Sequence, residues 1–177
     1  MLYTKLLETF ILPLGDLINN SNYVERLKYW RKLDLLSEEK LLDIQGKNLS
    51  SLLKHTVQNV ATYSTINLKG TNPYLWINEF PVLTKEFLKA NSEKLIAKNF
   101  SKKKLLKYSS SGSTGTQTSV YMNKKEQANI RAILSHWWEW SSYKIGKPIA
   151  QTGITPNRSN LKKIKDCFFR TAYINAF

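Results

Sequence analysis

The stretch that decides the fold reads Ser109-Ser110-Ser111-Gly112-Ser113-Thr114-Gly115-Thr116. The segments beside it, Leu105 to Ser109 and Thr118 to Met122, have the length and composition of short strands. Glycine lets the backbone approach a ligand closely. Successive N–H groups in such a turn can point at one anion, and hydroxyl groups add further donors. The stretch therefore predicts a phosphate-binding loop between two strands.

The loop has an alternative interpretation. A flexible Ser/Gly linker has a similar composition, and from spacing alone that interpretation stays open beside phosphate binding. The ordered patterns on both sides favour a built loop. The loop is not of the Walker type, because no Gly-Lys-Ser/Thr follows, and it does not fit the Gly-x-Gly-x-x-Gly dinucleotide pattern.

Helical patterns surround the loop. Apolar residues spaced by three predict a helix over Tyr23 to Leu36, and Ser37 followed by two glutamates predicts the start of the next. Thr84 is placed to cap a helix that runs to about Ile96. The spacing of Asn123 and Glu126 is that of a capping box, which starts a helix ending near Gly146. Pro148 to Thr155 has the pattern of a short strand, and the last twenty residues that of a helix.

The net charge of +14, from 27 basic and 13 acidic side chains, indicates affinity for polyanions. The lysines are spread along the chain, which favours a solvated Lys-rich surface, and the dense group is Lys102 to Lys104 with Lys107. A basic nucleic-acid-binding protein is an alternative that rests on charge alone, so nucleic acid is not the favoured partner. The single cysteine, Cys167, excludes an internal disulfide. No window predicts a membrane span, and we expect a cytoplasmic protein.

A second candidate site is the pair His136 and Glu139, three residues apart on the predicted helix. Such a pair could serve a metal or acid–base chemistry. Two ligands are too few for a zinc site, so core packing and surface pairing are the favoured interpretation, and no metal site is predicted.

The residues Ser110-Ser111-Gly112-Ser113-Thr114-Gly115-Thr116 closely resemble the phosphate-loop signature of the adenylate-forming superfamily. Three further stretches are similar to its phenylacetate–CoA ligase and CapK (capsular polysaccharide biosynthesis) branch. They are the pair Tyr29-Trp30, the helical segment Gln45 to His55, and the segment Phe80 to Lys85. The resemblance spans roughly residues 23–146.

The resemblance implies an AMP-forming ligase that uses ATP and Mg, with coenzyme A as a further cofactor to consider. Its substrates would be a nucleotide and a carboxylic acid. By position, the loop would hold the β- and γ-phosphates through side-chain hydroxyls and backbone donors. The hydroxyls would be those of Ser110, Ser111, Ser113 and Thr114, and the backbone donors those of Gly112, Gly115 and Thr116. No catalytic residue can be assigned by position. Gln117 stands where the signature has proline.

For the fold, the resemblance implies an α/β protein, of which this chain would be an α+β fragment. We expect a helical segment over residues 1–100, then over residues 101–177 the beginning of an ATP-binding domain with an incomplete sheet. The family's C-terminal domain and later motifs have no place in 177 residues. We therefore expect the chain alone to be inactive and able to associate through an exposed strand edge. A non-catalytic remnant domain is a third alternative.

Overall fold

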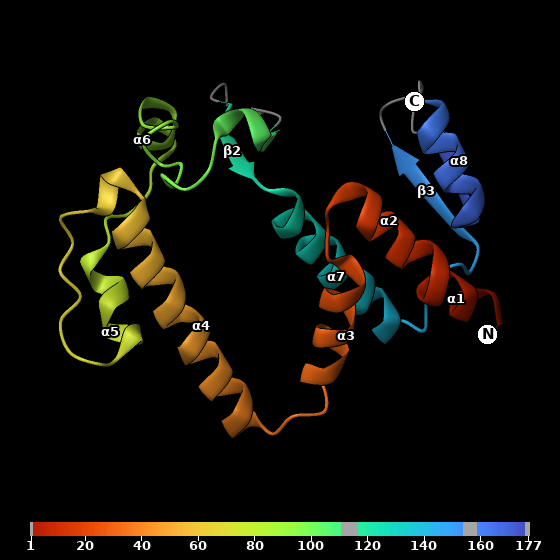
Figure 1. Ribbon diagram of the computed structural model, residues 1–177, viewed down its shortest axis with the longest axis horizontal. Helices are drawn as coiled ribbons and strands as arrows, with labels where there is room; N and C mark the ends of the chain where they lie inside the picture. Colours follow the sequence, from red (N-terminus) through yellow and green to blue (C-terminus); the bar gives the residue numbers. More distant parts are fainter. Residues whose placement is uncertain (1, 111–116, 154–158, 176–177) are drawn as a thin grey trace. The chain divides into compact units, whose positions relative to one another are not determined.

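The structure is a computed structural model, and it describes residues 2–110, 117–153 and 159–175 (Figure 1). The chain folds as two compact units. Unit 1 is made of residues 1–32 and 127–177, and unit 2 of Leu33–Glu126. The boundary predicted after residue 100 lies inside unit 2. The predicted domains refer to the parent fold and stay a prediction.

Unit 2 is built on the long helix α4 (Glu38–Asn59), which begins directly after Ser37 as predicted. Its C-terminal half packs on η2 (Ala61–Tyr63) and α5 (Pro73–Trp76), where Leu53, Val60, Tyr63 and Trp76 are buried. Backbone and side-chain bonds tie the end of α4 to the segment that precedes the hairpin. Lys98 N–H donates to the carbonyl of Asn59 (2.8 Å), and Thr62 Oγ1 donates to that of Lys94 (3.2 Å).

The helix predicted from Thr84 is confirmed at its start and wrong at its end. The Thr84 side chain accepts the amide of Phe87 (3.2 Å) at the N-terminus of α6 (Lys85–Ala90), after the turn η3 (Ile77–Glu79). The helix stops at Ala90 instead of near Ile96. Asn91 follows with ψ 18°, and its side chain donates to the carbonyl of Phe87 (3.1 Å). Such local side-chain bonds compete with continued helix.

Unit 2 ends with η4 (Lys102–Lys104) and two strands, β1 (Leu106–Ser109) and β2 (Ser119–Met122). Both strands lie within the segments predicted for them. The capping box after β2 is confirmed by two reciprocal bonds. Asn123 N–H donates to Glu126 Oε2 (2.6 Å), and Glu126 N–H donates to Asn123 Oδ1 (2.9 Å). The helix that follows, α7 (Lys124–Trp140), ends before Gly146, and Ser142 beyond it has φ 62°.

Unit 1 packs its first helical segment on α3 (Tyr23–Leu33) and α7. The segment runs without a break through α1 (Leu2–Leu6), the π-helical turn η1 (Leu7–Ile11) and α2 (Leu12–Asn19). The buried core of unit 1 consists of Leu7, Leu27, Ala132 and Ile145. The Asp16 carboxylate accepts the amides of Tyr23 (2.9 Å) and Val24 (2.8 Å), which fixes the start of α3.

The C-terminal part of unit 1 is a β–α–β unit made of β3 (Ile149–Gly153), α8 (Asn160–Phe168) and β4 (Thr171–Asn175). The two strands pair in parallel, with Ile149 opposite Thr171. The predicted strand is confirmed, whereas the predicted terminal helix covers only α8. Arg170 adopts φ 50°, which ends the helix, and the β-branched and aromatic residues after it pair with β3.

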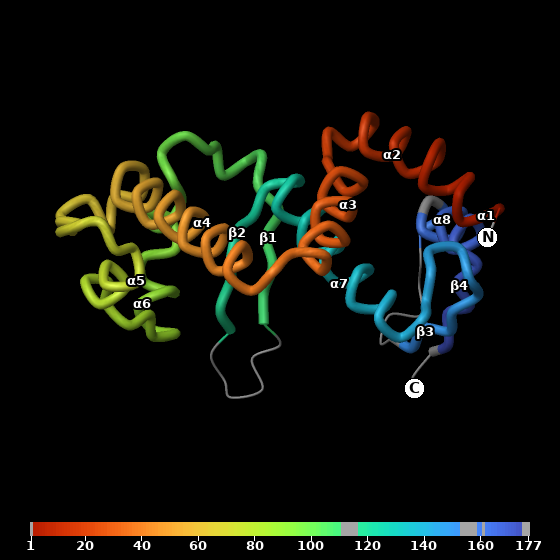
Figure 2. The backbone as a smooth tube through the Cα atoms, turned by 90° about the horizontal axis from the view of Figure 1, so that it is seen from below, coloured from red at the N-terminus to blue at the C-terminus, as the bar shows by residue number. Residues whose placement is uncertain are grey.

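The described residues therefore form an α+β structure with two separate two-stranded sheets, β1–β2 antiparallel and β3–β4 parallel. This confirms the predicted class with its small, incomplete sheets. Figure 2 shows each strand pair side by side.

Gly146 tests the packing of unit 1. It has φ 89°, and a Cβ added there would lie 2.6 Å from Leu7 Cδ1 and 3.0 Å from Tyr3 Cδ1. Because Leu7 is fully buried, Gly146→Ala combines backbone strain with overpacking. We expect it to destabilise the chain by at least about 2 kcal/mol in urea denaturation.

Gly15→Ala is the matched control, because a Cβ at this helical position meets nothing within 4 Å. We expect it to stabilise the chain by about 0.5–1 kcal/mol. Equal effects of the two substitutions would contradict the packing described for Gly146.

Candidate phosphate-binding hairpin

The predicted phosphate loop is carried by an antiparallel hairpin of β1 and β2. Its register pairs Leu106 with Met122 and Ser109 with Ser119. Alternation along the strands places Lys107, Ser109, Ser119 and Tyr121 on one face. The sequence prediction of two strands that flank the loop is thus confirmed, and the structure adds that they pair with each other.

Hydroxyl groups close the hairpin where the loop begins. The Oγ atoms of Ser109 and Ser119 lie 2.8 Å apart. One step further, Ser110 N–H donates to the carbonyl of Thr118 (2.9 Å), and Thr118 N–H donates to Ser110 Oγ (3.1 Å). Ser110 Oγ is also 3.2 Å from Thr118 Oγ1. These contacts hold the two ends of the connection together.

The predicted phosphate ligands divide into two groups. Ser110 is described and exposed, and its amide and hydroxyl take part in the closing bonds. A phosphate contact from its hydroxyl would have to replace or share those bonds. The remaining candidates lie outside the described residues, so their role stays a prediction: Ser111, Gly112, Ser113, Thr114, Gly115 and Thr116.

The charge beside the hairpin is positive. Lys103, Lys104 and Lys107 are exposed, and no Asp or Glu occurs in the sequence from Leu105 to Met122. Lys102 is engaged instead: its Nζ lies 2.6 Å from Glu93 Oε1 and 5.5 Å from the centre of the Tyr121 ring. The hydrogen bond from Lys102 lowers the pKa of the exposed Glu93 carboxyl. The donors near the loop therefore suit an anion.

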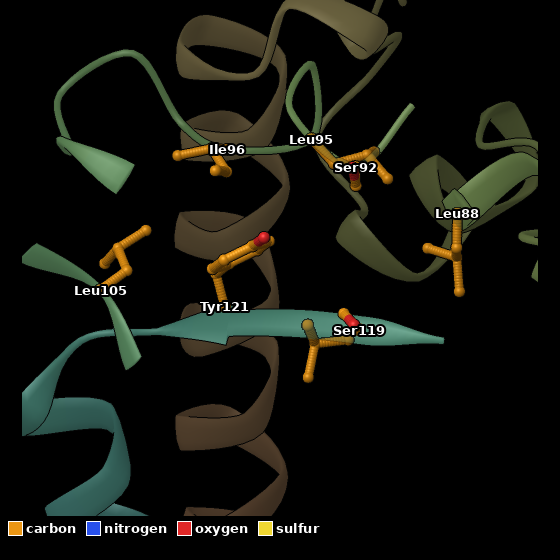
Figure 3. A pocket seen from close by; sticks show the side chains of 8 residues that line it. Leu88, Ser92, Leu95, Ile96, Leu105, Ser119 and Tyr121 are labelled. Carbon is orange, nitrogen blue, oxygen red and sulfur yellow. The ribbon is translucent and has the colours of Figure 1, made fainter. Parts of the chain in front are cut away.

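A small hollow lies against the face of β2 that bears Ser119 and Tyr121 (Figure 3). It holds about 230 Å³, less than the ~300–1,000 Å³ of typical small-molecule sites. Its lining is mainly apolar: Leu88, Ser92, Leu95, Ile96, Leu105, Ser119, Val120 and Tyr121. This hollow suits a short hydrocarbon group and is too small and too apolar for a nucleotide.

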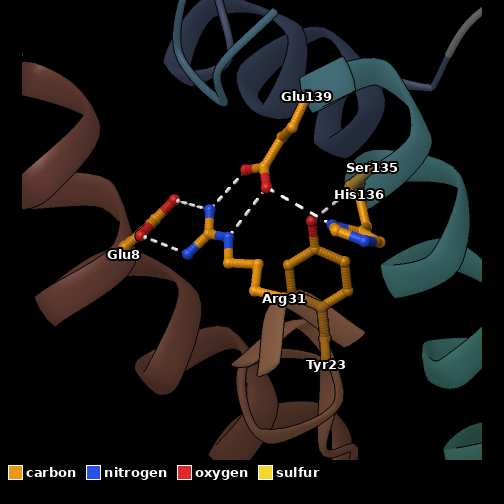
Figure 4. A network of polar contacts seen from close by, with 6 residues as sticks. All are labelled: Glu8, Tyr23, Arg31, Ser135, His136 and Glu139. Carbon is orange, nitrogen blue, oxygen red and sulfur yellow. Dashed lines mark hydrogen bonds and ion pairs between the residues drawn. The ribbon is translucent and has the colours of Figure 1, made fainter. Parts of the chain in front are cut away.

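The second sequence candidate, His136 with Glu139, belongs to an ion-pair network in unit 1 (Figure 4). Arg31 donates to both oxygens of Glu8, at 2.6 and 3.0 Å, and to both oxygens of Glu139. His136 is 4% exposed, with Nδ1 3.7 Å from Glu139 Oε2. Beside the network, Tyr23 Oη donates to Ser135 Oγ (2.8 Å). The pair thus serves packing and pairing, as favoured from the sequence.

Burial and charge act in opposite directions on the network. Burial by itself would raise the pKa of the Glu139 carboxyl, but the hydrogen bonds and charge of Arg31 hold that pKa below its ordinary value of 4.5. Burial raises the pKa of Tyr23 to about 12. Within the described ranges, no three His, Cys, Asp or Glu side chains gather as metal ligands would. The arrangement ties η1, α3 and α7 together.

Sequence reasoning missed Arg31 and Glu8. They lie 108 and 131 residues before Glu139, and neither stands in a motif, so no local signal marks them. Paired acids and bases that are distant in sequence become visible only through the packing of the helices that carry them.

Comparison with curated proteins shows a similarity to a longer protein. The chain is 29% identical over 165 residues to Protein CapK of Staphylococcus aureus, covering 88% of this chain and 35% of that protein. The chain thus spans about a third of the length of the curated relative it matches. No family model matches, and no solved structure matches. A weak similarity to CapK over most of the chain is therefore established.

Arg31→Met tests the network. It leaves two carboxylates, 25% and 11% exposed, without their shared partner. Removing one partner from a fully buried pair costs about 3–5 kcal/mol, and partial exposure here reduces our expectation to about 2 kcal/mol at pH 7. Lys28→Met, at an exposed position of the same helix, is the control and should change stability by less than about 0.5 kcal/mol.

The same variant has a pH signature. Because the folded-state pKa of Glu139 is depressed, its stabilising contribution is present above about pH 4.5 and is lost as the pH falls through the lowered value. The difference in unfolding free energy between the original chain and Arg31→Met should therefore shrink below pH 4.5. A constant difference down to pH 3 would contradict the ion pairing.

Proposed function

We propose that this chain carries the segment that binds the terminal phosphates of ATP in an acyl-adenylate-forming ligase of the phenylacetate–CoA ligase and CapK type. The observation that carries the proposal is the hairpin stem, Ser109–Ser110 paired with Thr118–Ser119, which flanks the phosphate-loop signature in the sequence. The similarity to CapK over most of the chain supports it.

The chemistry of the hairpin fits the terminal phosphates better than a metal ion. Its described groups are hydroxyls, backbone amides and the ammonium group of Lys107, and these are donors for phosphate oxygens. Magnesium prefers oxygen ligands such as carboxylates and phosphates. The segment from Leu105 to Met122 has no carboxylate. The hairpin would therefore hold Mg–ATP through its phosphates.

The proposed reaction joins a carboxylic acid to AMP. A carboxylate oxygen attacks the α-phosphorus of ATP, a new P–O bond forms, and the bond to the β-phosphate oxygen breaks to release pyrophosphate. Negative charge grows on the leaving pyrophosphate. Donors already fixed around that group stabilise the charge without reorganisation, and this is usually a large part of catalysis. Lys107 and the loop amides would serve that purpose.

The proposal assigns only the phosphate-binding step to these residues. The chain spans 35% of CapK, and the adenine, ribose and acid sites of the superfamily would come from regions beyond it. The acceptor of the activated acyl group is left open, with coenzyme A one candidate.

Phosphorus NMR of Mg–ATP with the full chain tests the proposal. We expect the β- and γ-phosphate signals to broaden and shift more than the α signal, because the loop holds the terminal phosphates. Ser113→Ala with Thr114→Val removes two predicted hydroxyl donors and should weaken binding about tenfold. Lys107→Gln should weaken it by about threefold to tenfold.

Lys40→Gln is the matched control for net charge, because it removes one exposed lysine from α4, away from the hairpin. It should leave the affinity for ATP within about twofold. Equal losses in Lys40→Gln and Lys107→Gln, or full affinity in the Ser113/Thr114 variant with unchanged circular dichroism, would show non-specific attraction by a basic chain and refute the proposal.

A further inference from the structure

The N-terminal helical segment of unit 1 presents an apolar stripe to solvent. Its members are 47–85% exposed, and they recur every three or four residues: Leu2, Leu6, Phe10, Leu14, Leu17 and Ile18. The remaining exposed positions between Leu2 and Ile18 are Lys5 and Thr9. Single exposed apolar residues are ordinary. A continuous row along three helical elements marks a contact surface.

The opposite face of the same segment is already used. Leu7 is fully buried in the core of unit 1, with Tyr3, Ile11 and Leu12 packed against that core. The acidic residues also turn inward: Glu8 pairs with Arg31, and Asp16 accepts the amides that start α3. The segment is therefore apolar on both faces, and its outer face carries no acidic group among the described exposed side chains.

The π-helical turn η1 keeps the stripe straight. In an α-helix of 3.6 residues per turn, each four-residue step from Leu2 to Leu14 would rotate the side chain forward by about 40°. The wider turn at Leu7–Ile11 winds in the compensating direction. The row thus stays on one side of the segment. π-helical turns are rare and occur often at functional sites.

Exposed basic groups occur on the helix whose end contacts the first helical segment. The C-terminal end of helix α8 contacts α1, where Tyr3 Oη donates to the carbonyl of Phe168 (2.6 Å) (Figures 1 and 2). Lys162, Lys163 and Lys165 are exposed on α8, together with Ile164, which is 54% exposed. An exposed apolar row and exposed lysines in the same unit are the composition of proteins that lie in the interface of anionic membranes.

We propose that the outer face of α1, η1 and α2 docks on an anionic lipid bilayer. The charge of the chain selects this occupant: at +14, two copies would meet with strong like-charge repulsion, whereas anionic headgroups attract the chain. No helix among the described residues is long and apolar enough to cross a bilayer. The segment lies on the surface with Leu2, Phe10 and Leu17 inserted among the acyl chains near the headgroups.

Vesicle sedimentation with the full chain tests this inference without nucleotide, so its outcome is independent of ATP binding. The vesicles are phosphatidylcholine mixed with phosphatidylglycerol, and phosphatidylcholine alone. We expect the chain to bind the anionic vesicles and to be released by added salt. Phe10→Glu with Leu17→Glu should reduce binding by at least about tenfold, because two inserted side chains become charged.

The matched control is Leu35→Glu with Val82→Glu. It makes the same change in polarity and net charge at positions that are 84% and 89% exposed in unit 2. It should alter binding by less than about threefold. Lys162→Gln with Lys163→Gln should weaken binding at low salt and flatten its salt dependence.

Two outcomes would overturn the inference. One is that the chain does not bind anionic vesicles, or that the Phe10→Glu/Leu17→Glu variant binds them as well as the Leu35→Glu/Val82→Glu control does. The other is a dimer in solution that Phe10→Glu with Leu17→Glu converts to monomer while vesicle binding stays absent, which would assign the stripe to a second copy of the chain.

Discussion

The hydrogen bonds between Ser110 and Thr118 determine where the loop of residues 111–117 begins and ends. Residues 111–117 connect Ser110 to Thr118 in the sequence. These two residues are held together because Ser110 N–H donates to the Thr118 carbonyl and Thr118 N–H donates to Ser110 Oγ. Pairing in the hairpin therefore already compensates the entropy lost on bringing the loop ends together, and ligand binding does not have to compensate it. Under the proposed function, a loop whose ends are held in this way would offer donors to phosphate with little reorganisation, which is the condition for useful electrostatic stabilisation.

The positive charge of the chain is used in two different ways. Arg31 is half-buried between two carboxylates and holds helices together, and its hydrogen bonds with Glu139 and Glu8 raise the pKa of its guanidinium group. Lys107 on β1 and Lys162 on α8 are exposed. In the two proposals they would attract anions, phosphate in unit 2 and lipid headgroups in unit 1. The two proposals rest on separate units and on different residues, so either can fail without the other.

Local signals in the sequence predicted the elements that local chemistry builds. The cap at Thr84 and the capping box at Asn123 form as predicted, because each needs only residues within one helical turn. β1, β2 and β3 were likewise predicted from their composition. The early end of α6 and the strand β4 were not, because a side-chain bond at Asn91 and pairing with β3 decide them.

The candidate site was predictable in position and only partly in geometry. The hydroxyl-and-glycine stretch marks the loop, but its register places Ser110 opposite Thr118 in the stem, which no spacing rule reveals. Arg31 and the outward row on the first helical segment were invisible for a related reason. Which face of a helix is buried, and which distant charge it meets, depends on packing that the local pattern does not contain.

Hydrogen exchange measured by mass spectrometry, with and without Mg–ATP, tests the central claim most directly. If the hairpin positions a phosphate loop, nucleotide should slow amide exchange in peptides that cover residues 106–122 and leave α4, residues 38–59, unchanged. Unchanged exchange across residues 106–122 at concentrations of ATP that saturate binding would contradict the account.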